Sequence, residues 1–163
     1  MNQFRKLNAK EILAIIEENY TISQFAYNEW SEAKDVELSQ ELQDKIKAYT
    51  DSREKLKNHP GYNDRNKRDS EYELLQENYN SNNYPFQDEE AEILSKLGLG
   101  EVVEVEQFGG EGMGDDWYSV KYFKGHDVYI KVSGSYTSYS GTDFYEGFGV
   151  EVRPQEKTIT VYE

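Results

Sequence analysis

The chain of 163 residues contains no cysteine and only two histidines. The lack of cysteine excludes a disulfide framework, a thiolate zinc site and a cysteine nucleophile. His59 and His126 both lie in turn-type sequence, outside any HExxH or Ser/His pattern, so we expect solvated side chains without a catalytic role. These absences favour a protein that binds a partner over one that catalyses a reaction.

Long apolar runs are also missing. The first 20 residues, MNQFRKLNAKEILAIIEENY, carry acidic residues after only a short apolar stretch, so they match neither a signal peptide nor a membrane span. The 14 tyrosines and 7 phenylalanines nevertheless supply large side chains for a core. We expect a soluble, cytoplasmic protein that contacts no membrane.

Positive charge is scarce in the second part of the chain. Residues 1–70 hold 13 acidic and 12 basic residues, whereas residues 71–163 hold 19 acidic and 6 basic residues. Between residues 71 and 116 there are 13 acidic residues and a single base, Lys96. Because a nucleic-acid backbone is bound through Lys and Arg, we expect no direct nucleic-acid binding by this part. It is suited instead to a basic cleft.

Helical periodicity dominates the first part of the chain. Asn8 with Glu11, and Thr21 with Gln24, have the spacing of a capping box that opens a helix. The expected helices cover about 9–19, 21–33, 37–58, 70–79 and 88–97. We expect the first three to form a small bundle. The stretch NYNSNNYPFQ (78–87) is the expected joint, which predicts a helical region at 1–85 and a second domain at 86–163.

After Gly100 the apolar residues alternate with polar ones, which is the period of a β-strand. Strands are predicted around 103–106, 118–122 and 128–132, and a last strand at 158–162. In that last strand Ile159 and Val161 are expected to point to one side. Turns are expected at 124–127 and 154–157. The sequence therefore predicts an α+β fold, with four to five helices followed by an antiparallel sheet of about five strands.

Acidic residues in the stretch 88–116 form a candidate binding surface. Alternate residues of a strand lie on one face about 6.6 Å apart, so Glu104 and Glu106 are expected to place charges at a regular step. The acidic candidates are Glu89, Glu90, Glu92, Glu104, Glu106, Glu111, Asp115 and Asp116. Such an array suits a groove lined with Lys and Arg. The alternative is that the acidity serves only solubility.

The loop FGGEGMGDD (108–116) allows two further interpretations. It lacks the GxxxxGK[ST] pattern of a phosphate loop, and its acidic groups would repel phosphate. It also lacks the DxDxDG spacing of a calcium loop, although Glu111, Asp115 and Asp116 have the oxygen ligands that a hard cation takes. A polar turn between two strands is the favoured interpretation, and we expect neither metal nor cofactor.

Tyrosine, serine and glycine dominate residues 133–149, SGSYTSYSGTDFYEGFG. Antibody paratopes use the same residue types, because tyrosine supplies rigid contact area and the others supply adaptable polar groups. Tyr136, Tyr139 and Tyr145 are therefore candidate partner-binding residues. The alternative is an edge strand whose aromatic residues pack on the sheet. We expect a mixture of the two, in which Tyr139 and Tyr145 point outward.

The stretch from FGGEGMGDDWYSVKYF to the end, TITVYE (108–163), resembles the end domain of small, mostly uncharacterised proteins encoded by bacteriophages and prophages. The resemblance implies a mobile-element setting and a bacterial host. Small acidic proteins in that setting are often host-defence inhibitors of the anti-CRISPR or anti-restriction type. The expected function is a non-enzymatic inhibitor, a nucleic-acid mimic that occludes the basic site of a host enzyme.

Two alternatives remain open at this point. A phage accessory or regulatory protein could contact DNA through the N-terminal helices and the basic residues of RNKR (65–68). An enzyme could use an acid pair, Asp115 and Asp116, with a divalent metal ion.

Overall fold

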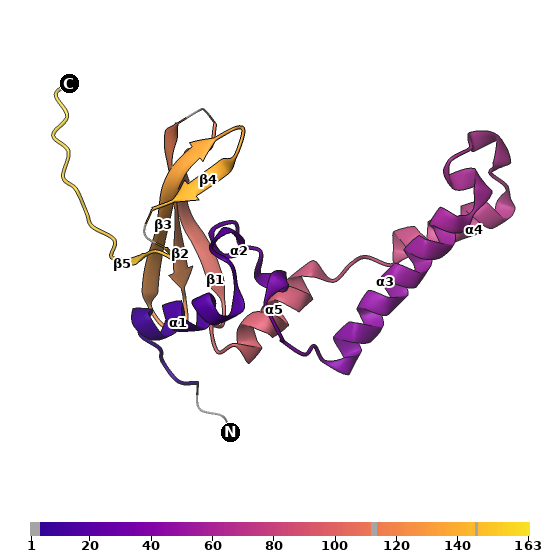
Figure 1. Cartoon of the computed structure of the whole chain (residues 1–163), viewed down its shortest axis with the longest axis horizontal. Coiled ribbons are helices and arrows are strands. Elements are labelled where there is room, and N and C mark those ends of the chain that lie inside the picture. Colours follow the sequence, from indigo (N-terminus) through magenta and orange to yellow (C-terminus); the bar gives the residue numbers. More distant parts are fainter. Residues whose placement is uncertain (1–3, 112–113, 146) are drawn as a thin grey trace. The chain divides into compact units, whose positions relative to one another are not determined.

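Figure 1 shows the computed structural model, which describes residues 4–111, 114–145 and 147–163. Helices precede an antiparallel sheet, so the predicted α+β fold is confirmed. Within the described ranges, no helix combines the length and the apolarity that a membrane crossing needs. The chain divides into two compact units, residues 37–92 and the remainder. This division differs from the expected boundary near residue 85, because the first helices pack on the sheet and the middle helices pack on each other.

The first two helices begin at their predicted caps. In α1 (Ala9–Asn19), the Asn8 side chain accepts a hydrogen bond from the Glu11 backbone N–H at 2.9 Å. Thr21 caps α2 (Ile22–Ala26) in the same way. The expected continuation to residue 33 is wrong, because Asn28 adopts a left-handed conformation with φ 58° and ends the helix. A 3₁₀ turn, η1 (Trp30–Glu32), follows.

The sheet has five strands, in the order β1-β2-β3-β4, with β5 also paired to β3. All the pairs are antiparallel. The strands are β1 (Val102–Phe108), β2 (Asp115–Phe123), β3 (Val128–Thr137), β4 (Gly141–Phe144) and β5 (Val150–Val152). The predicted turn at 124–127 joins β2 to β3. The expected number of strands is confirmed, although the last strand lies elsewhere.

The core of this unit lies between α1, α2 and one face of the sheet, which we call the inner face. Ile12, Ile16 and Phe25 from the helices are fully buried, as are Phe123 and Ile130 from the sheet. Burying side chains of this size contributes about 1.5–3 kcal/mol each. The expected bundle of the first three helices is therefore wrong, since α1 and α2 pack on the sheet and the third predicted helix packs on the fourth.

The unit of residues 37–92 is built on a helical hairpin. Its two arms, α3 (Gln40–Asn58) and α4 (Ser70–Ser81), pack against each other and are joined by the short turns η2 (Pro60–Tyr62) and η3 (Arg65–Lys67). Asp69 caps α4, and its side chain accepts from Tyr72 N–H at 2.9 Å. A further helix, α5 (Phe86–Lys96), is followed by Gly98 at φ 78°, a left-handed conformation that ends helices.

The C-terminal end contradicts one prediction. The expected strand at 158–162 is absent from the described structure, and residues 153–163 have no regular secondary structure. The expected turn at 154–157 lies within the same irregular segment. The ladder of β5 has already reached Tyr129, so only Val128, the first residue of β3, remains for the chain beyond Val152 to pair with.

Candidate recognition surface

An acidic pocket of about 590 Å³ lies at the end of the sheet formed by the β1–β2 connection. It is lined by Gln107, Phe108, Gly109, Glu111, Asp115 and Asp116. Figure 1 places this connection and the tip of the β3–β4 hairpin at the same end of the sheet, away from α1. We call this region the distal end. Three of the predicted acidic residues, Glu111, Asp115 and Asp116, therefore come together there.

Gly109 explains how two of these carboxylates reach the pocket. It adopts φ 85°, and a Cβ atom at this position would lie 2.1 Å from the backbone oxygen of Asp116. Only glycine allows both this conformation and this close approach. The backbone of residue 109 therefore lies directly against β2, and Asp115 and Asp116 begin that strand at the rim of the pocket.

The predicted split of the tyrosines is confirmed. Tyr139, at the tip of the β3–β4 hairpin, is 90% exposed and Tyr145 is 58% exposed. Tyr136 is half-buried and packs against the core, as do Phe144 and Phe148. The hydroxyl of Tyr145 donates to Asp116 Oδ1 at 3.4 Å, which places an exposed aromatic ring beside the acidic pocket.

The aromatic contacts of Tyr27 hold the β3–β4 hairpin in place. Its ring lies 5.4 Å from that of Trp117 and 6.4 Å from that of Phe144, and its hydroxyl hydrogen bonds to Thr142. The distal end thus rests on three aromatic side chains, of which Trp117 is buried. Among the described residues, no Lys or Arg lies within ion-pairing distance of Glu111, Asp115 or Asp116. Their charges remain available to a cationic partner.

Glu104 and Glu106 do not share a face, so this prediction is wrong. Glu104 pairs with Lys121 and Glu106 with Val120, because a bulge between the two glutamates shifts the register. Neighbouring residues of β2 point to opposite sides of the sheet. Glu104 therefore lies on the inner face, whereas Glu106 lies on the other, outer face and accepts a hydrogen bond from Tyr118.

Glu104 belongs to a polar cluster at the edge of the inner face, where its side chain is 31% exposed. Its Oε2 accepts from Ser119 Oγ at 2.9 Å and from Asn28 Nδ2 at 2.7 Å, and lies 3.5 Å from Lys121 Nζ. Desolvation raises the pKa of Glu104, but these hydrogen bonds and the lysine charge outweigh it and leave the pKa below its ordinary value. The carboxylate is thereby committed to an internal contact.

Lys121 is the centre of this cluster, and its side chain has no exposed surface. Its Nζ donates to Ala26 O and to Ser119 Oγ, both at 2.9 Å. Burial lowers the pKa of Lys121 to about 8, against the raising effect of Glu104. Ser119 is also fully buried. The cluster connects α2 to β1 and β2.

The helix acids of α5 do not form the expected exposed array. Glu89 is 8% exposed, and its Oε2 has no hydrogen-bond partner among the described residues. Burial, together with the charge of Glu89, raises the pKa of Glu90. Glu92 is half-buried and accepts a hydrogen bond from Ser39 N–H at 2.7 Å. The expectation of exposure is wrong for Glu89, and only partly met for the other two.

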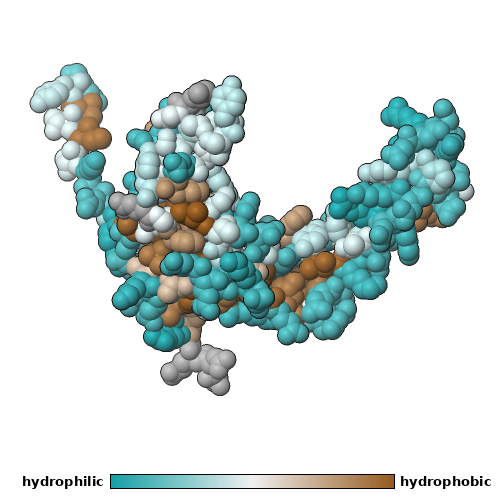
Figure 2. All heavy atoms as spheres, viewed as in Figure 1, coloured by the Kyte–Doolittle hydropathy of each residue, from teal (hydrophilic) through white to brown (hydrophobic). Residues whose placement is uncertain are grey.

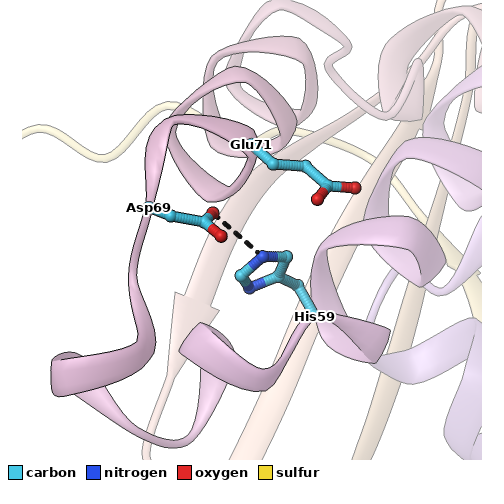
Figure 3. A group of neighbouring side chains, drawn as sticks. All are labelled: His59, Asp69 and Glu71. Carbon is cyan, nitrogen blue, oxygen red and sulfur yellow. Dashed lines mark ion pairs between the residues drawn. The ribbon is translucent and has the colours of Figure 1, made fainter.

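His59, Asp69 and Glu71 lie close together at the end of the helical hairpin (Figure 3), with potential ligand atoms within 4.8 Å of one another. They line a pocket of about 740 Å³. His59 Nδ1 accepts from Gly61 N–H at 2.9 Å, so the proton of the neutral ring is on Nε2, which lies 3.1 Å from Asp69 Oδ1. A metal at Nε2 would have to displace this proton, so the arrangement favours an Asp–His hydrogen bond.

His126 is 1% exposed, which corrects the expectation of a solvated side chain. Its Nδ1 accepts from Leu7 N–H at 2.8 Å, and its Nε2 lies 3.0 Å from Gly98 O. The ring stacks on Phe4 at 4.8 Å. His126, in the turn between β2 and β3, thus contacts both the N-terminal residues 4–7 and Gly98 after α5. His59 is also mostly buried, with a side chain 8% exposed.

No protein-family model, curated protein or solved structure matches the chain. The site is therefore interpreted from its own residues. Sequence reasoning missed Phe108 and Gln107, which line the acidic pocket, and the buried cluster around Lys121. One signal was present for the cluster: Trp117 and Phe123 occupy the same strand face as Ser119 and Lys121.

Proposed function

We propose that this protein is a non-catalytic binding protein that recognises a basic partner through the distal end of its sheet. The observation that carries the proposal is the pocket with Glu111, Asp115 and Asp116, whose carboxylates have no cationic partner among the described residues and lie beside exposed aromatic rings. Carboxylates select a positively charged surface and raise the association rate, while aromatic side chains supply desolvated contact area.

The partner class that we propose is a host enzyme with a basic nucleic-acid site, such as a defence nuclease. Carboxylates on a rigid support can take the positions of phosphates against Lys and Arg. The proposed protein acts by competition, as a phage-encoded inhibitor, and needs no chemistry of its own. The acidic charge of residues 71–163 supports this proposal, because it disfavours the wrong partner, nucleic acid itself.

The test compares two variants with the same loss of charge. Asp115→Asn with Asp116→Asn removes two charges from the pocket, whereas Glu17→Gln with Glu18→Gln removes two exposed charges from α1. Each tagged protein is used to capture partners from lysates of bacteria that carry defence systems. A partner is then purified, and its displacement from labelled nucleic acid is measured at low and high salt.

We expect the pocket variant to bind the purified partner at least about tenfold more weakly at low salt, as the loss of charged contacts predicts. The α1 variant should bind like the wild type. Equal affinity of both variants would refute the distal end as the recognition surface. A partner that keeps its nucleic acid when saturated with this protein would refute the competitive mechanism.

A second candidate function is DNA contact by the helical hairpin. Residues 53–68, around its tip, hold six basic and two acidic residues. Within the described part of the chain, Arg53, Lys55, Lys57 and Arg65 form no ion pair, although the protein is acidic. A gel shift with the full chain tests this function, since a fragment of residues 1–85 would remove the sheet under α1 and α2. Lys55→Gln with Lys57→Gln should abolish any shift; an unchanged shift would refute the candidate.

A further inference from the structure

The chain ends in an exposed segment with the composition of a strand, residues 154–163, which we call the C-terminal arm. Its residues Thr158 to Val161 are all β-branched, a composition that favours strands. Ile159, Val161 and Tyr162 are 80%, 74% and 92% exposed. Figure 2 shows apolar side chains on this segment, near the C-terminus marked in Figure 1. A strand-forming segment with this much exposed apolar surface lacks its partner.

The sheet has an unoccupied edge of matching length. Among the described strands, β1 pairs only with β2, so the backbone groups along its other side have no strand partner. Val103 and Val105 on β1 are 40% and 48% exposed. Beside them, the outer face holds a groove of about 460 Å³, lined in part by Val105, Val120 and Tyr129 and, on its other side, by residues 152–155 at the base of the chain's own arm.

We propose that the arm of one copy adds as a strand to β1 of a second copy. Residues 158–162 supply the missing backbone hydrogen bonds to the edge, in the manner of strand addition. Ile159 and Val161 then lie on the outer face beside Val103 and Val105. Each chain carries one arm and one open edge. When two copies each add their arm to the β1 edge of the other, both edges are paired and the dimer is closed and two-fold symmetric. This inference goes beyond the proposed function and does not depend on it.

In the structure, the arm is not paired with its own β1. Arg153 donates to Asp127 O at 2.8 Å, which places the base of the arm beside the turn between β2 and β3, and the chain beyond it runs away from the sheet (Figure 1). A second copy is therefore the acceptor that leaves the base of the arm where the structure places it.

The first experiment measures molar mass by light scattering over a micromolar concentration series. Deletion of residues 156–163 removes the arm, and Ile159→Lys with Val161→Lys removes its apolar side. The control, Glu156→Gln with Glu163→Gln, makes the same change in net charge outside residues 158–162 and outside the groove. We expect the wild type and the control to approach the dimer mass, and the other two to remain monomers. A monomeric wild type, or a dimer that survives deletion of the arm, would overturn the proposal.

A mixing experiment assigns the acceptor edge. Val103→Lys with Val105→Lys blocks β1 but leaves the arm intact, and circular dichroism verifies that the variant is folded. If it does not fold, Val103→Lys alone replaces it. Neither the edge variant nor the arm deletion should dimerise alone, whereas their mixture should form one-to-one pairs because one keeps the arm and the other keeps the edge. A mixture without pairs would overturn β1 as the acceptor.

The proposed function and the dimer can fail separately. The arm-deleted chain keeps Asp115, Asp116 and Tyr145, so it should bind a captured partner as the wild-type monomer does. The pocket variant Asp115→Asn with Asp116→Asn should keep the dimer mass. The arm deletion thus tests the dimer alone, and the pocket variant tests partner binding alone.

Discussion

Lys121 Nζ and Glu104 Oε2 lie 3.5 Å apart between β1 and β2, on the face of the sheet that packs against the helices. A buried ammonium group is costly unless hydrogen bonds and an opposite charge surround it, and here Ala26, Ser119 and Glu104 do so. The bulge in β1 follows this pair and places Glu106 on the opposite face. Without it, Glu104 and Glu106 would share a face.

Glu104→Gln should lower the free energy of unfolding by about 1–3 kcal/mol, because it leaves the buried lysine without its counter-charge. Glu106→Gln should change it by less than about 0.5 kcal/mol, since an exposed hydrogen bond contributes little. Urea unfolding at neutral pH measures both. Equal losses would contradict the placement of the two glutamates on opposite faces.

Lys121 should give the stability a distinctive dependence on pH. Its pKa is about 8 in the folded state and 10.5 in the unfolded chain, so between these values the unfolded chain binds more protons. Stability therefore rises with pH in this window, by up to about 1.4 kcal/mol per pH unit.

The matched measurement is urea unfolding of the wild type and of Lys121→Met from pH 7 to pH 10. Methionine does not titrate, so the stability of the wild type relative to the variant should increase above pH 8. A difference that stays constant across the series would show that the lysine pKa is not lowered.

His59 should be protonated on Nε2 and should not bind zinc tightly. Its Nδ1 accepts from Gly61 N–H, which leaves the proton on the nitrogen that faces Asp69. Nitrogen-detected NMR of the imidazole distinguishes the two tautomers, and titration with zinc tests binding in the same sample. Stoichiometric zinc binding that His59→Ala abolishes would contradict this interpretation.

His126→Ala should destabilise the protein by about 2–4 kcal/mol, because it leaves a cavity and removes the partners of Leu7 N–H and Gly98 O. Thermal unfolding by circular dichroism measures the loss. His126→Asn keeps one polar group and should recover part of it. If the alanine variant were as stable as the wild type, the ring could not be connecting the three segments.

The sequence by itself determined the local structure. Asn8 and Thr21 marked the starts of α1 and α2, because a cap depends on residues within one turn. The helix predicted at 88–97 lies within two residues of α5 at each end, because helical periodicity is local too. The alternation of Val128, Ile130 and Val132 gave the buried face of β3 correctly, and the exposure of Tyr139 and Tyr145 followed from composition.

Only the tertiary structure decided which segments meet. The bulge at β1, the inward orientation of Lys121 and the burial of His126 depend on partners up to 119 residues away in sequence, to which no local pattern refers. The composition predicted an acidic protein, but it could not predict which carboxylates would be available to a partner. Glu89 is buried, and Glu104 hydrogen bonds to Ser119 within the fold. The candidate site is therefore the distal end, where the fold leaves Glu111, Asp115 and Asp116 exposed beside Tyr145.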